Sequence, residues 1–213
     1  MHRETWIAPN GARYTLRPLQ AADADLLAGL LNGSLTGPSR FQRFHGTLGR
    51  LSVQRLQQLA DVDFVRHHAW VVTLDDAEGT QAVAEARFYV SADGQQAEFA
   101  LATADRWQRQ GLATRLMQRM LDAARSHGLQ RLHGEVLCHN AAMLALMHGC
   151  GWACAPHPHE QGLMVAERRL PTLSAAPLAR WAPATVTVAT RSFDRCMASL
   201  LGLRLALVGA FGH

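Results

Sequence analysis

The sequence predicts an α+β domain with a central, mixed but mostly antiparallel sheet flanked by helices. Three apolar stretches between residues 69 and 102 are separated only by turn signals, which is typical of antiparallel strands joined by hairpins. From residue 111 onward helical and strand patterns alternate, which is typical of a β-α-β unit. An antiparallel front half joined to such a unit gives sheet and helices packed in layers.

The first part of the chain is expected to hold one strand and two helices. The strand covers Arg13–Arg17, where polar and apolar residues alternate up to Pro18. The first helix covers Asp23–Leu31, with leucines at helical spacing, and glycines and a proline at 32–38 break it. The second helix begins after Ser52, because serine commonly caps helix N-termini.

The hairpin region and the back half supply the other elements. Strands are expected at Ala69–Leu74, Ala82–Val90 and Ala97–Ala102, with Asp93-Gly94 as the turn between the last two. The back half follows as helix Gly111–Ser126, strand Leu132–Leu137, helix Asn140–Met147 and strand Leu163–Leu170. The predicted order is therefore β-α-α-β-β-β-α-β-α-β.

Composition divides the chain into three parts. These are a short N-terminal segment (1–11), a folded domain (12–170), and a linker with an apolar C-terminal arm (171–213). The linker is rich in Ala, Thr and Pro, which is typical of loosely ordered connections. The apolar stretch of the arm is shorter than a spanning helix needs and contains Arg204, so we expect no membrane span.

The basic residues exclude several chemistries. All 21 are Arg, so no lysine can form a Schiff base or serve a phosphate-binding loop. The net charge of +4 and the isoelectric point of about 9.3 mildly favour anionic partners. The arginines are scattered and no nucleic-acid motif is present, so we expect no nucleic-acid partner.

The four cysteines, at positions 138, 150, 154 and 196, do not have the spacing of a secreted disulfide framework. The first residues also lack the apolar run of a signal peptide. We therefore expect a cytoplasmic protein.

The segment Trp107-Gln108-Arg109-Gln110-Gly111-Leu112-Ala113 lies at the predicted junction of a strand and the long helix. A helix N-terminus presents unpaired N–H groups and the positive end of a dipole, which together bind phosphate oxygens. Gly111 lets the backbone approach a ligand closely, and Ala113 keeps the site open. A glycine at a helix start is weak evidence by itself, since an ordinary turn has the same sequence.

A second pattern agrees with the first. Gln108-x-x-Gly111-x-Ala113 resembles the acyl-CoA pyrophosphate loop of the GNAT superfamily of N-acetyltransferases, and Asn140-x-x-Met143-Leu144-x-Leu146 followed by Gly151-Trp152 resembles its second CoA segment. The resemblance spans roughly residues 12–170. It implies a GNAT fold, in which splayed strands form an acyl-CoA cleft.

Finer motifs are similar to the GNAT domains of bacterial Pat-type protein lysine acetyltransferases. They are Ser39-Arg40-Phe41-x-Arg43-Phe44-His45, Val62-Asp63-Phe64, Ala97-Glu98-Phe99-Ala100, Asp105-x-Trp107-Gln108 and Gly134-Glu135-Val136-Leu137. This narrower resemblance implies acetyl-CoA as the donor and a protein lysine as the acceptor.

The family resemblance assigns roles to particular residues. Main-chain amides around Arg109–Ala113 would hold the pyrophosphate, and pantetheine would lie between strands 97–102 and 132–137. The amide of Leu101 would donate to the thioester carbonyl, and Asn140 would bond the pantetheine arm or the helix start. The positions expected to bind the donor are Leu101, Gln108, Arg109, Gln110, Gly111, Leu112, Ala113, Thr114 and Asn140.

Glu98 is the expected catalytic base, because it matches the glutamate proposed for this role in the Pat-like group. A lysine ammonium has a pKa near 10.4, so a base must remove a proton before the amine attacks. We expect apolar neighbours to raise the pKa of Glu98. The other reading of Glu98 is a surface carboxylate on a strand.

One position departs from the family pattern. Many GNAT members place a tyrosine in the helix after the asparagine, where it protonates the departing thiolate. The aligned residue is Met147, which has no proton to give. The thiolate would then leave unassisted or through water, or the site would be degenerate.

Two weaker patterns were weighed against the motif. His157-Pro158-His159-Glu160 follows Cys150 and Cys154, but this spacing does not match a zinc site, and we expect no metal. Arg40, Arg43 and His45 have two readings: a contact with the acceptor or a CoA phosphate, or a charged cluster on a solvated helix end.

The sequence thus predicts an N-acetyltransferase that passes an acetyl group from acetyl-CoA directly to an amine. The first expected acceptor is a protein lysine. The alternatives are a small-molecule amine acetyltransferase and a non-catalytic acyl-CoA sensor. A homodimer is left open as a further partner.

Overall fold

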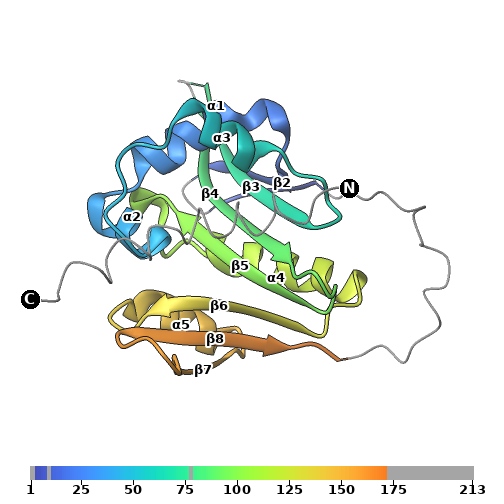
Figure 1. The fold of residues 1–213 in the computed structure, drawn as a ribbon. Helices are drawn as coiled ribbons and strands as arrows, with labels where there is room; N and C mark the ends of the chain where they lie inside the picture. The colour runs from blue at the N-terminus through green and yellow to red at the C-terminus, as the bar shows by residue number, and fades with distance from the viewer. Residues whose placement is uncertain (1–2, 9–10, 77–78, 172–213) are drawn as a thin grey trace, which may run out of the picture. The chain divides into compact units, whose positions relative to one another are not determined.

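The strands form one eight-stranded sheet in the part of the chain that the structure describes, residues 3–8, 11–76 and 79–171 (Figure 1). The structure is a computed structural model. Contacts within the chain separate a unit Met1–Leu173 from the remainder. The expected C-terminal arm therefore lies almost entirely outside the described residues.

The sheet has the spatial order β1-β2-β3-β4-β5-β6-β8-β7. Its strands are β1 (Glu4–Ile7), β2 (Arg13–Pro18), β3 (His67–Asp76), β4 (Gly79–Val90), β5 (Gln96–Thr103), β6 (Arg131–Leu137), β7 (Ala153–Pro156) and β8 (Leu163–Arg169). Every neighbouring pair is antiparallel except β5 with β6, which is parallel. The expected mixed, mostly antiparallel α+β architecture is confirmed.

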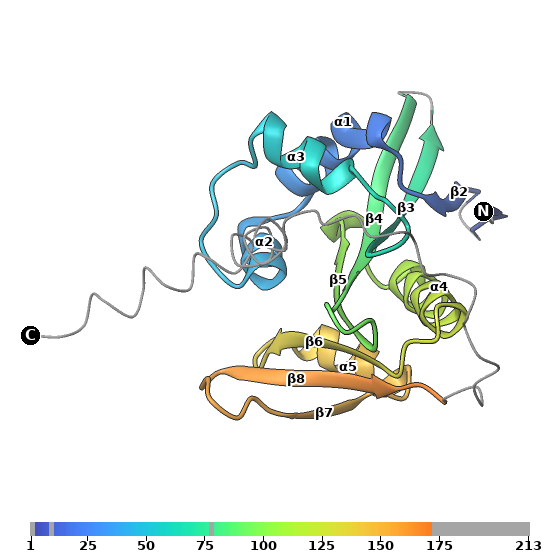
Figure 2. The same cartoon turned by 45° about the vertical axis from the view of Figure 1, so that its right-hand side comes forward.

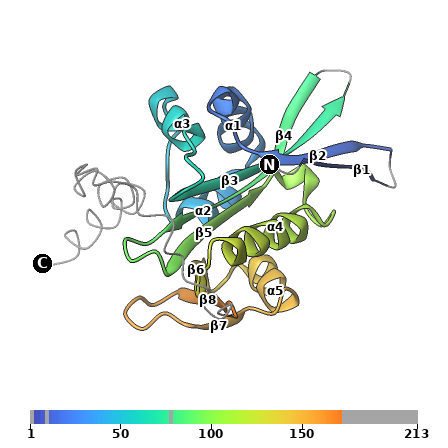
Figure 3. The ribbon, with the colours of Figure 1, turned by 90° about the vertical axis from the view of Figure 1, so that its right-hand side faces the viewer.

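Helices cover both faces of the sheet. The α-helices are α1 (Ala24–Ala28), α2 (Gly37–Phe44), α3 (Val53–Ala60), α4 (Leu112–Ser126) and α5 (Ala141–Gly149). Shorter helical segments are the 3-10 turns η1 (Ala21–Asp23) and η3 (Asp105–Trp107) and the π-helical segment η2 (Gly29–Ser34). In Figure 3, α4 and α5 lie on one side of the sheet and α1–α3 on the other.

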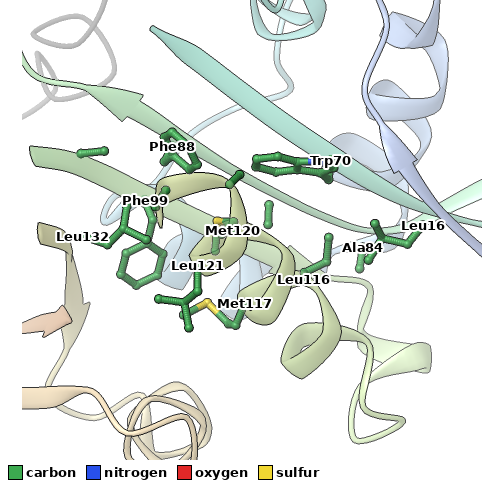
Figure 4. Packing of buried hydrophobic residues seen from close by; sticks show 14 of the residues in the cluster. Leu16, Trp70, Ala84, Phe88, Phe99, Leu116, Met117, Met120, Leu121 and Leu132 are labelled. Carbon is green, nitrogen blue, oxygen red and sulfur yellow. The ribbon is translucent and has the colours of Figure 1, made fainter. Parts of the chain in front are cut away.

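Two apolar clusters hold these layers together. The first joins the aromatic residues Trp70, Phe88 and Phe99 of the sheet to the Leu and Met stripe of α4 (Figure 4). The second joins leucines of α1, η2 and α3 to the opposite face, where Val71 of β3 is fully buried. Strand β3 is buried along most of its length because both of its faces are covered.

The predicted elements recur with small shifts at their ends. The hairpin at Asp93-Gly94 is confirmed: Gly94 has φ +70°, and the Ser91 N–H donates to the Gln96 carbonyl at 2.8 Å. The helix expected at Asp23–Leu31 divides into α1 and the π-helical segment η2. Three elements were not predicted, namely β1, α2 and β7. Strand β1 falls in segment 1–11 and extends the sheet by pairing with β2.

Candidate active site

The parallel strands β5 and β6 form a fork. They pair only at Gln96↔Arg131, Ala97↔Leu132 and Glu98↔His133. The two ribbons run close together at their starts and separate towards their ends, as Figures 1 and 2 show. Beyond Glu98 and His133, each strand therefore presents main-chain groups towards the fork that the other strand does not bond.

The pairing of β5 with β4 determines which main-chain groups of β5 face the fork. Alternate residues of a strand point their N–H and C=O groups to opposite neighbours. The Gln96 carbonyl accepts from Ser91, and the Ala104 N–H donates to the Val83 carbonyl at 2.9 Å, so even-numbered residues bond towards β4. No register shift intervenes. The amides of Leu101 and Thr103 therefore point towards β6.

A side chain fills the root of the fork. The Phe99 ring lies against Gly134 so closely that a Cβ on Gly134 would come within 2.6 Å of Cε1 of the ring. Phe99 also packs against Trp152, with ring centroids 4.8 Å apart and ring planes tilted by 60°. Gly134 is therefore required by this close approach, which closes the core side of the fork.

The loop 108–111 leads from the end of β5 into α4, and its backbone is unusual. Arg109 has φ +61°, and Gly111, the N-cap of α4, has φ +78°. The first helical bond runs from the Arg115 N–H to the Gly111 carbonyl at 3.1 Å. The amides of Leu112, Ala113 and Thr114 precede that bond and have no acceptor within the helix. This end of α4 has the geometry of an anion site.

Side-chain contacts with Tyr14 and Thr103 hold the loop in place. The Tyr14 hydroxyl donates to Gln110 Oε1 at 2.7 Å, and its ring meets Trp107 edge-on at 6.1 Å. Burial raises the pKa of Tyr14, so the hydroxyl stays protonated and can donate. Gln108 Nε2 donates to the Thr103 carbonyl at 3.4 Å. The side chains of Gln108 and Gln110 thus hold the loop, and their main chain is left to face a ligand.

Asn140 and Met147 lie on α5, behind the second arm of the fork. Asn140 caps the helix, because its Oδ1 accepts from the Met143 N–H at 3.1 Å. This is the helix-start bond that the sequence predicts as one of two roles for Asn140. Met147 is fully buried in the core beneath the sheet.

Glu98 lies where strand pairing ends. Its cross-strand neighbours are Tyr89 on β4 and His133 on β6. The sequence predicts apolar neighbours for this carboxylate, and that detail is wrong, since both residues opposite it in register carry polar groups. Alternation along β5 puts Glu98 on the same face as Ala100 and opposite to Phe99 and Leu101, as predicted.

The cluster Arg40, Arg43 and His45 divides into two parts. Arg40 donates to the main-chain carbonyls of Leu31, Leu48 and Gly49, which folds the loop after α2. Arg43 pairs with the fully buried Glu85 at 2.9 Å. Both arginines thus hold the chain around α2, and the two readings offered by the sequence stay predictions.

Three further polar side chains, to which the sequence analysis gave no settled role, lie close together in the structure. His45 ends α2 with φ +52°, and its Nδ1 lies 4.0 Å from Glu135 Oε2. His157, which the sequence predicts to be an ordinary loop residue, lies 3.5 Å from Glu135 Oε1 through its Nε2. Glu135 was quoted only within a motif and had no predicted role. The available signal was the strand alternation, which puts Glu135 on the same face as His133.

A cavity of about 440 Å³ lies beside this group. It is lined by Gly37, Pro38, Arg40, Phe41, Gln42, Gly46, Thr47, Leu48 and His139. These residues come from α2, from the loop after it, and from the chain just beyond β6. Because His45 directly precedes Gly46, the cavity adjoins the contact between α2 and Glu135.

A model of the acetyltransferase (GNAT) domain matches residues 13–153, which include the sheet from β2 to β6 and the fork. The chain belongs to the GNAT acetyltransferase family. Members of this family use acetyl-CoA, and the fork and the α4 N-terminus of this chain fit that donor. The buried Thr103 Oγ1, which has no partner among the described residues, lies on the open part of β5.

Individual GNAT relatives are more than a quarter identical to this chain over the aligned residues. The chain is 27% identical over 151 residues to acetyltransferase PA5475 of Pseudomonas aeruginosa, covering 71% of this chain and 81% of that protein. It is 28% identical over 172 residues to acetyltransferase Pat of Mycolicibacterium smegmatis, covering 78% of this chain. The match spans about half of that Pat protein, 49% of its length.

Solved GNAT structures confirm the fold. The crystal structure of the GNAT domain of S. lividans PAT superposes with a TM-score of 0.69 at 24% identity, covering 79% of this chain and 97% of that domain. This likeness concerns the fold alone.

The described residues contain no group of three or more His, Cys, Asp or Glu side chains disposed to hold a metal ion. Within the same ranges, no helix has both the length and the apolar character needed to cross a membrane.

Proposed function

We propose that this GNAT protein transfers an acetyl group from acetyl-CoA directly to an amine, and that the preferred acceptor is a lysine of another protein. The observation that carries the proposal is the fork between β5 and β6, which leads to the amides at the start of α4. The Pat-like motifs around Glu98 and Asp105 support the choice of a protein lysine. The proposed catalytic domain comprises residues 12–170, and 171–213 is proposed to be a linker with an apolar C-terminal arm.

The donor would lie along the fork. The amides of Gly111, Leu112, Ala113 and Thr114 are proposed to bind its pyrophosphate, since a helix N-terminus favours negative charge. Pantetheine would add to β5 as an extra strand. The Leu101 N–H would then donate to the thioester carbonyl and stabilise the negative charge that develops there.

Glu98 is proposed to accept the proton of the acceptor ammonium. Leu101 is three positions further along the strand, which is about 10 Å in an extended chain. The proton would therefore reach Glu98 through water. Met147 is buried and has no acidic proton, so the thiolate would take its proton from solvent.

Two alternatives stay open. The cavity of about 440 Å³ beside α2 would suit a small-molecule amine as well as a peptide. The methionine at position 147 would suit an acyl-CoA sensor that binds the donor without turnover.

The test uses acetyl-CoA labelled in the acetyl group, the purified protein and a lysate of its own cells. Because this chain contains no lysine, any acetyl-lysine found by mass spectrometry belongs to another protein. Acetyl-lysine that disappears with Glu98→Gln supports the proposal. Label in a small molecule instead indicates a small-amine enzyme. Bound acetyl-CoA with no label transferred indicates a sensor and contradicts the proposal.

A further inference from the structure

Glu135 lies on the second arm of the fork, past the point where pairing ends. Continuing the parallel register from Glu98↔His133 by two residues puts Glu135 level with Ala100, next to Leu101. Its side chain is on the α2 side of the sheet, because Leu132 and Val136 of the same strand point into the core under α4. Glu135 is therefore nearer along the fork to Leu101 than Glu98 is.

His157 is arranged to orient this carboxylate. The main-chain N–H of Glu160 donates to His157 Nδ1 at 2.9 Å, so Nδ1 must be an acceptor. The ring proton is then on Nε2, which lies 3.5 Å from Glu135 Oε1. If Nδ1 also carried a proton, its N–H would point at the main-chain N–H of Glu160, and this hydrogen bond would be lost. The bond from Glu160 thus fixes the ring so that its Nε2 edge faces Glu135.

His45 approaches the second oxygen of the carboxylate, Oε2, at 4.0 Å. The side chains of His45 and Glu135 are each 21% exposed and that of His157 is 15% exposed, so the group is shielded but open to solvent. A carboxylate at this level of the fork, with two imidazoles around it, is suited to bind a cation brought in by the acceptor.

The adjoining cavity is suited to the carbon skeleton of such an acceptor. Its walls include Pro38, Phe41 and Leu48. Arg40 also lines it, but its guanidinium donates to main-chain carbonyls of Leu31 and Leu48. The cavity therefore favours an apolar chain over an anion.

We propose that Glu135, oriented by His157, binds the primary alkylammonium group of the acceptor, while the cavity beside α2 receives the adjoining carbon chain. The chemistry is that of a lysine side chain or a polyamine arm. This inference rests on the proposed function: Glu135 holds the acceptor amine beside Leu101, whereas Glu98 removes its proton.

The test measures binding without requiring turnover. The probe is N-α-acetyl-lysine methylamide, and the matched neutral probe is N-α-acetyl-norleucine methylamide. The full chain carries ¹³C-labelled histidine, and the ring signals of His45 and His157 are assigned with His45→Asn and His157→Gln variants. The lysine probe should shift both signals and saturate, and the norleucine probe should not.

Variants then identify the carboxylate. Glu135→Gln should weaken the lysine probe about tenfold or more, since a charge-assisted hydrogen bond is lost. Glu167→Gln is the matched control, because Glu167 lies on the same face of the neighbouring strand β8 and pairs with Arg131. It should bind the probe as the wild type does. Glu98→Gln should also retain binding.

His157 has its own test as a positioning residue. His157→Gln keeps a donor near the position of Nε2, and His157→Asn removes it while keeping an acceptor near Nδ1. Binding of the lysine probe should be partly restored in the glutamine variant and not in the asparagine variant. Equal weakening in both variants would mean that the ring only supports the Glu160 turn.

Three results overturn the proposal: unchanged binding in Glu135→Gln, equal shifts with the norleucine probe, or no shifts in the wild type. A wild-type protein that binds the lysine probe but never acetylates an amine overturns the proposed function and leaves this inference standing. If the Glu135→Gln variant acetylates lysine with the KM of the wild type, this inference is wrong and the proposed function still stands.

Discussion

Single residues set the geometry of the proposed donor site, and Gly111 is the clearest case. Its φ of +78° is a conformation that other residues adopt at a cost, and a Cβ there would meet no protein atom within 4 Å. A substitution at Gly111 therefore costs backbone strain in the free protein. Any larger effect on function must come from a ligand that approaches the backbone.

Gly111→Ala should raise the KM for acetyl-CoA about tenfold while destabilising the protein by about 1 kcal/mol. Gly128→Ala is the matched control, because Gly128 has φ +71° at the other end of α4. It should lose similar stability and keep the wild-type KM. Steady-state kinetics and urea unfolding of both variants measure this, and equal KM values would remove Gly111 from the donor site.

At the scale of elements, Asp105 connects the two sides of the site. It lies in η3, just before the loop that leads to α4, and accepts from Thr36 N at 2.9 Å and Ser39 Oγ at 2.6 Å. Burial raises the pKa of Asp105, but these hydrogen bonds outweigh burial and hold the pKa below its usual value. The donor loop and the start of α2 are thus held by one carboxylate.

Asp105→Ala should loosen α2 without unfolding the protein, at a cost of about 1–2 kcal/mol for the lost hydrogen bonds. Hydrogen exchange should become faster at the start of α2 and stay unchanged in the middle of α4. Asp93→Ala, in the β4–β5 hairpin, serves as a control for the loss of a turn carboxylate. Unchanged exchange in α2 would show that Asp105 does not anchor this helix.

The sequence predicts long elements well and short ones poorly. Helix α4 and strands β3–β5 were predicted because their apolar periodicity extends over eight or more residues. Strands β1 and β7 have four residues each, which is too few for a period to be recognised. Helix α2 was read as a break because it begins with Gly37-Pro38. Its cap was visible, however: Thr36 Oγ1 accepts from Ser39 N, and proline is common in a first helical turn.

The candidate site was predictable where it lies on one continuous segment. The loop from Gln108 to Thr114 carries its own signals for a tight turn and a helix start. The group of His45, Glu135 and His157 could not be predicted, because it depends on how α2, β6 and the loop after β7 meet in space. No local pattern reports a contact between residues separated by such lengths of chain.

At the scale of the whole molecule, buried histidines couple folding to pH. Burial lowers the pKa of His67 and of His68 to about 4. In the unfolded chain both would titrate near 6.5. Between these values the unfolded state binds more protons than the folded state, so stability falls as the pH is lowered from 6.5 to 4.

The free energy of unfolding should decrease by about 3 kcal/mol per histidine by pH 4. His68→Phe, which keeps a ring beside Phe88, should remove about half of this pH dependence. His148→Phe is a control on an exposed face of α5. Urea unfolding between pH 6.5 and 5 measures the contribution of the histidines, because over this range most Asp and Glu carboxylates are ionised in both the folded and the unfolded state. An identical pH profile in His68→Phe would contradict this account.

The central claim is that the donor occupies the fork between β5 and β6, and a crystal structure of the complex with acetyl-CoA tests it most directly. We predict pantetheine between residues 100–103 and 134–137, the thioester oxygen within hydrogen-bond distance of the Leu101 N–H, and the pyrophosphate on the amides from Gly111 to Thr114. A donor bound elsewhere, or strands β5 and β6 paired along their whole length in the complex, would contradict the account.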